Sequence, residues 1–75
     1  MRFYFDINDD FFAAVDPEGA ELPDVEAAER EAIAIATAVA RDVFSSRGTE
    51  VLVIVRKDRQ ALFELRVTAA RKDVG

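Results

Sequence analysis

The chain has 75 residues, a hydrophobic share of 51% and a formal net charge of −5. This composition is typical of one small globular domain and argues against a disordered or membrane-spanning chain. Because the sequence contains neither cysteine nor histidine, it offers no disulfide and no conventional zinc or haem site, and no cofactor is expected.

The sequence gives no sign of membrane insertion or export. Its longest apolar run, residues 51–55, is far too short to span a bilayer. Asp6 interrupts the N-terminal apolar stretch almost at once, which argues against a signal peptide. We therefore expect a cytoplasmic protein that has no membrane partner.

The N-terminal segment predicts a β-hairpin. Phe3, Phe5 and Ile7 alternate with polar residues, which is the period-2 pattern of a half-buried strand. A turn is expected at residues 8–10, because Asn and Asp tolerate left-handed backbone and bond to their own chain. Residues 11–15 then form the predicted second strand.

A long helix is predicted after the turn at residues 16–19. Asp24 is its expected N-cap, because a carboxylate can accept hydrogen bonds from the free amides of the first turn. The helix is expected to end near residues 45–48, with Gly48 as a left-handed terminator. Its predicted inner face is rich in small residues: Val25, Ala28, Ala32, Ile35, Ala36, Val39 and Val43, widened by Ile33, Ala40 and Phe44.

The C-terminal part predicts two more strands. Residues 49–56 include an unbroken apolar run, as in strands that are covered on both faces. Residues 57–60 form a predicted turn, and residues 61–68 resume the alternation of a strand. Residues 69–75 are expected to be a flexible tail.

These elements predict an α+β fold, a two-layer β-β-α-β-β sandwich formed by a single domain over residues 1–68. The expected sheet has four strands, is mainly antiparallel with strand order 2-1-3-4, and carries one long helix on one face. Since one helix covers one face only, the apolar third strand leaves a patch exposed on the other.

Such a patch predicts a homodimer through the open sheet face or through a sheet edge. The candidate interface residues are Tyr4, Leu52, Ile54 and Leu62. The alternative is that the patch is small and tolerated, or that the C-terminal tail folds over it.

The sequence offers little evidence of a catalytic or ligand-binding site. Without histidine the usual general base at neutral pH is missing, and we predict no catalytic, cofactor-binding or metal-binding residue. The acidic run at residues 6–10 resembles the start of a calcium loop, but Phe11 and Pro17 occupy the positions that need Gly and Glu. An enzyme that works with carboxylates or a metal at these loops is the least favoured interpretation.

The basic residues suggest an alternative function. Arg56, Lys57 and Arg59 gather near one turn and could contact nucleic acid. Because the protein as a whole is acidic and would be repelled by phosphates, we do not expect nucleic acid as its partner.

Three stretches resemble a known family of short proteins. They are residues 2–7 (RFYFDI), 16–19 (DPEG) and 21–28 (ELPDVEAA). The sequence is similar to an uncharacterised family, common in alphaproteobacteria, with an aromatic N-terminal strand and a G-x-E-L-P-D-h-E-A-A helix entry. Its domain is of unknown function, so the resemblance implies a small cytoplasmic β-β-α-β-β protein and no activity. The chain departs from the family pattern at residues 11–12 and 59–60.

The expected function is therefore that of a non-enzymatic interaction or regulatory module that acts as a homodimer. A second protein is the other candidate partner.

Overall fold

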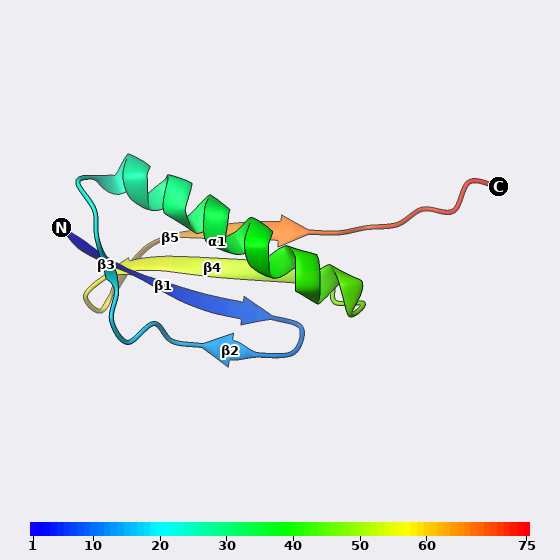
Figure 1. Cartoon of the computed structure of the whole chain (residues 1–75), viewed down its shortest axis with the longest axis horizontal. Coiled ribbons are helices and arrows are strands. Elements are labelled where there is room, and N and C mark those ends of the chain that lie inside the picture. The colour runs from blue at the N-terminus through cyan, green and yellow to red at the C-terminus, as the bar shows by residue number, and fades with distance from the viewer.

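The computed structural model describes residues 1–75 as one sheet with a single helix across one face (Figure 1). All strand pairs are antiparallel, the main path through the sheet is β2-β1-β4-β5, and β3 also pairs with β1. The elements are β1 (Arg2–Asp9), β2 (Ala13–Ala14), β3 (Ala20–Glu21), α1 (Val25–Ser45), β4 (Glu50–Lys57) and β5 (Gln60–Thr68).

The predicted α+β class is confirmed, and the four strands of the main path follow the predicted order. The sheet differs from the prediction because it has a fifth strand, β3. The chain runs along the free edge of β1 from β2 to β3, but the loop between them leaves the ladder. There the carboxylate of Asp16, in place of a carbonyl, accepts the Phe5 N–H at 3.1 Å. This exchange divides the edge into two short strands.

The first turn also lies later than predicted. β1 continues to Asp9, and Asp9 Oδ1 accepts the N–H groups of Phe11 and Phe12 at 2.7 and 2.9 Å. The Asp9 N–H in turn donates to the Phe12 carbonyl at 2.9 Å. Phe11 and Phe12 therefore belong to the turn, and the second strand keeps only two residues instead of five.

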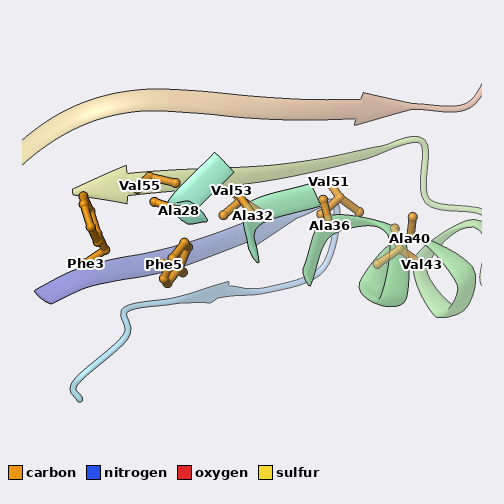
Figure 2. Close-up of a cluster of buried hydrophobic side chains, with 10 residues drawn as sticks. All are labelled: Phe3, Phe5, Ala28, Ala32, Ala36, Ala40, Val43, Val51, Val53 and Val55. Carbon is orange, nitrogen blue, oxygen red and sulfur yellow. The ribbon is translucent and has the colours of Figure 1, made fainter. Parts of the chain in front are cut away.

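The core lies between α1 and the two central strands (Figure 2). Small side chains of the helix face larger side chains of the sheet, which lets α1 pack closely on the strands. The ten core residues are Ala28, Ala32, Ala36, Ala40 and Val43 from α1, Phe3 and Phe5 from β1, and Val51, Val53 and Val55 from β4.

The predicted inner face of the helix was too wide. Val25 and Ile33 are 45% and 43% exposed. Val25 lies in the first turn, ahead of the buried stripe that begins at Ala28. Ile33 follows Ala32 directly and therefore points about 100° further around the helix.

The two ends of α1 test two predictions about caps. Asp24 is the N-cap, as predicted, and its side chain accepts the Ala27 N–H at 2.8 Å. The prediction for Gly48 was wrong, because Arg47 is the residue with positive φ, at 68°. Gly48 is needed for space instead, because an added Cβ would clash with Cγ1 of Val43.

The face opposite α1 stays open. No element crosses it, and residues 69–75 extend away from the sheet instead of folding back over that face (Figure 1). The tail is tied to the sheet only at its start, where the Ala69 N–H donates to the Thr49 carbonyl at 2.9 Å. The predicted alternative in which the tail covers the patch is not realised.

The alanine stripe gives a test of the packing. We expect Ala36→Leu to lower the free energy of unfolding by about 1–3 kcal/mol, because Ala36 is fully buried and the larger side chain would overpack the core. Ala38→Leu, on the exposed side of the same helix, is the matched control. Urea unfolding measures both variants, and equal stability of the two would contradict the packing described.

Candidate functional site

The open face of the sheet brings together the four residues predicted for an interface. Tyr4 on β1 and Leu52 and Ile54 on β4 alternate with the core residues of these strands and are half-buried. Leu62 lies where the pairing of β4 with β5 shifts register, and is 39% exposed. The sequence therefore places its candidate interface on one surface.

Polar side chains border this apolar stripe on both sides. Asn8 and Arg66 lie opposite Leu52, whereas Asp6 and Glu64 lie opposite Ile54. The open face is thus a narrow apolar stripe on β4 between rows of polar and charged residues.

At one end of the stripe, Arg56 is held by its own chain. Its Nε donates to Asp6 Oδ2 at 2.8 Å, in an ion pair whose side chains are only 20% and 16% exposed. Its other nitrogens donate to the carbonyls of Asp16, at 3.0 Å, and Asp58. Its guanidinium carbon lies 4.6 Å from the ring centroid of Tyr4, which is a cation–π contact. Few donors of Arg56 remain for a ligand.

Tyr4 also lies against Gly19. Gly19 has φ +72° and lies so close to the ring that an added Cβ would come within 2.9 Å of Tyr4 Cε2. A glycine is therefore required here both for its backbone conformation and for space. The ring contacts both Gly19 and Arg56, so Tyr4 is a fixed part of the face.

Asp16 joins the edge loop to the sheet. Oδ1 of Asp16 accepts the N–H groups of Glu18 and Gly19 at 3.1 and 3.0 Å, while Oδ2 accepts that of Phe5. The Asp16 N–H donates to Asp6 Oδ1 at 2.9 Å. Burial alone would raise the pKa of Asp16, but the three amide bonds outweigh burial and lower it. Asp16 is thus a structural carboxylate.

The other acidic residues near the turns have the same role. Asp10 Oδ1 accepts the amides of Thr49 and Glu50 at 2.9 and 3.0 Å and so ties the first turn to the start of β4. These amide bonds, that of Glu50 first, lower the pKa of Asp10. For Asp6 the hydrogen bond from Arg56 is the main cause of a lowered pKa. No group of three acidic residues has the arrangement of a metal site.

The structure adds one feature that the sequence analysis missed, a hollow between α1 and the β2 edge. It has a volume of about 350 Å³ and is lined mostly by apolar residues, including Ile7, Val15 and Ile35. Its acidic lining residues are Asp16, which is already bonded, and Glu31. In the sequence, the apolar residues Val15 and Ile35 were the only sign of this hollow. That they lie close together depends on the tertiary fold, so the hollow could not be predicted.

The basic turn offers less than its sequence suggested. Because Arg56 is bound within the chain, Lys57 and Arg59 are the cations left at this turn. The Lys57 side chain approaches only the Met1 sulfur, at 3.8 Å. No helix in the structure combines the length and the apolar composition needed to cross a membrane.

Comparison with known proteins places the chain in a family. A family model described as Domain of unknown function (DUF6894) matches residues 2–68, which include every strand and the helix. The chain belongs to this family, as the resemblance had suggested. Neither the curated proteins nor the solved structures contain a match to the chain.

The carboxylates predict how stability depends on pH. Asp6, Asp10 and Asp16 have native pKa values below their ordinary value of 3.8. The unfolded chain therefore binds protons at a higher pH than the native one, and protonation favours unfolding. We expect the urea midpoint to be constant above about pH 5 and to fall as the pH drops below about 4 and through the lowered native values. A constant midpoint down to about pH 2 would contradict these assignments.

Asp16→Asn tests the central carboxylate. An amide can accept at one position only, so its NH₂ group would face either the Phe5 N–H or the loop amides. We expect a loss of about 1–3 kcal/mol in the free energy of unfolding at pH 7, the usual cost of an unsatisfied donor. Glu18→Gln, exposed in the same loop, is the control. Equal stability of the two variants would refute the role of Asp16.

Proposed function

We propose that the protein is a non-enzymatic interaction module that acts as a homodimer. The observation that carries this proposal is the small size of the core. Hydrophobic residues make up 51% of the chain, yet only ten are buried, and four of these ten are alanines. Small domains that bury little surface gain stability by associating.

The open sheet face supports the proposal. It carries Leu52, Ile54 and Leu62 on neighbouring strands, while α1 is on the opposite side of the sheet. Fixed residues such as Tyr4 lower the entropy lost on binding, because they are already ordered in the free protein. The proposal therefore includes this face as the surface that binds a second protein. The role proposed for the complex is regulatory, and its proposed location is the cytoplasm.

The competing functions have less support. A nucleic-acid surface at the basic turn would have to depend on Lys57 and Arg59, since Arg56 is bound to Asp6, and the net charge of −5 opposes it. A carboxylate enzyme would need free acidic groups that converge on a cleft. The side chains of Asp6, Asp10 and Asp16 instead accept hydrogen bonds from the chain itself.

The mass in solution tests the proposal. Size-exclusion chromatography with light scattering at about 50 μM should give twice the chain mass of 8.3 kDa and a decrease toward one chain on dilution, by mass action. A mass of 8.3 kDa at about 50 μM and above would contradict it.

A further inference from the structure

The two edges of the sheet differ in how they are protected. On the outer side of β1, β2 and β3 have two residues each, and a loop with Pro17 separates them. At the other edge, β5 runs for nine residues, Gln60–Thr68, without proline or lysine. Interruptions, proline, bulges and charged side chains, lysine above all, are the usual means of preventing edge-to-edge pairing. β5 has one bulge near its start, beside Leu62, and its two charged side chains, Glu64 and Arg66, have opposite signs.

The free main-chain groups of β5 can be assigned from its ladder with β4. The Ala69 N–H donates to Thr49, one step beyond the paired residues Thr68 and Glu50. Because bonding alternates along an antiparallel ladder, the odd-numbered residues of β5 bond to β4. The even-numbered residues beyond the register shift, which leaves Leu62 unpaired, therefore direct their N–H and C=O groups outward: Glu64, Arg66 and Thr68.

We propose that β5 pairs with β5 of a second copy, antiparallel, about a two-fold axis at Leu65. This inference rests on the proposed homodimer and specifies its interface. An axis perpendicular to the sheet keeps both helices on the same side and joins the two sheets into one. The outward groups of Glu64 and Arg66 then form about four main-chain hydrogen bonds across the axis.

Charge complementarity selects this register. With Leu65 on the axis, Glu64 lies opposite Arg66 of the second copy, and Arg66 lies opposite Glu64. Opposed side chains on paired strands have Cβ atoms about 4.5–5.5 Å apart, close enough for an ion pair. Within one chain Arg66 contacts Glu50 at 3.5 Å, whereas Glu64 takes part in no ion pair.

The neighbouring registers are unfavourable. An axis at Glu64 would place the two Glu64 carboxylates opposite each other, and an axis at Arg66 would do the same to the two arginines. Like charges directly opposite each other destabilise a strand pair. The register centred on Leu65 is therefore favoured over both.

The helix side of the pairing is apolar. Phe63, Leu65 and Val67 contact the core but are only partly buried, because β5 has no neighbour on its outer side. In the proposed register Phe63 lies opposite Val67 of the second copy, and the two Leu65 side chains meet at the axis. Pairing thus extends the core across the edge and removes apolar surface from water.

The same pairing would join the two open faces. The apolar stripe of Leu52 and Ile54 on β4 would occur twice on one continuous sheet, on the side away from both helices. This surface would be twice as large as that of one chain, so the dimer would present the proposed protein-binding face in symmetric form.

Charge reversal tests the register. We expect Glu64→Arg and Arg66→Glu each to weaken self-association about tenfold or more, because each places like charges opposite one another. A mixture of the two variants should form heterodimers, since one chain then carries two positive charges at these positions and the other chain carries two negative charges. The double variant, with the charges exchanged, should dimerise like the wild type.

The controls separate folding from association. Glu64, Arg66, Glu29 and Arg30 lie on the surface, and far-UV circular dichroism checks that each variant folds. Glu29→Arg and Arg30→Glu on the helix make the same charge changes and should leave the mass unchanged. Leu52→Gln changes the open face and should also leave a dimer.

The remaining outcomes are equally distinct. If the wild type is a dimer that the charge reversals do not weaken, or that Leu52→Gln dissolves, edge pairing is wrong and the proposed homodimer stands. Absence of heterodimers in the mixture would also overturn the register. A monomeric wild type would overturn both the register and the proposed function.

Discussion

A single helix has to cover a five-stranded sheet, and this constraint determines most of the structure. α1 approaches the strands closely because alanines form its buried stripe, and only Phe3, Phe5 and three valines of the sheet are enclosed beneath it. The second face of the sheet has no such cover. Both the limited core and the open face therefore follow from the same deficit, which links the fold to the proposed association.

Aspartate carboxylates connect the turns and strands that the small core does not reach. Asp9 and Asp16 accept amides in their own turns, whereas Asp10 and Asp6 reach residues distant in the sequence, at Thr49 and Arg56. The acidic character of the N-terminal third thus has a structural cause. The same bonds fix Arg56 and Tyr4 on the open face, so its polar border is rigid.

Features with a local cause could be predicted from the sequence. The alternation around Phe3 and the capping carboxylate of Asp24 depend on neighbouring residues, and both predictions are confirmed. The split of the edge strand depends on Asp16 bonding to Phe5, eleven residues away, and no periodicity indicates it. At the end of the helix the positive φ falls on Arg47, and Gly48 is needed for space beside Val43 and the distant Asp10. The interface residues were predicted onto one face, but the unprotected edge became apparent only once the strand order was known.

The central claim is that the unprotected β5 edge is where two copies meet. Amide hydrogen exchange of the wild type, followed by NMR at high and low protein concentration, tests it directly. Edge pairing predicts that the Glu64 and Arg66 amides exchange slowly in the dimer and rapidly on dilution, while the Leu65 amide, bonded to β4, stays protected at both concentrations. Rapid exchange of Glu64 and Arg66 in a sample shown to be dimeric would contradict it.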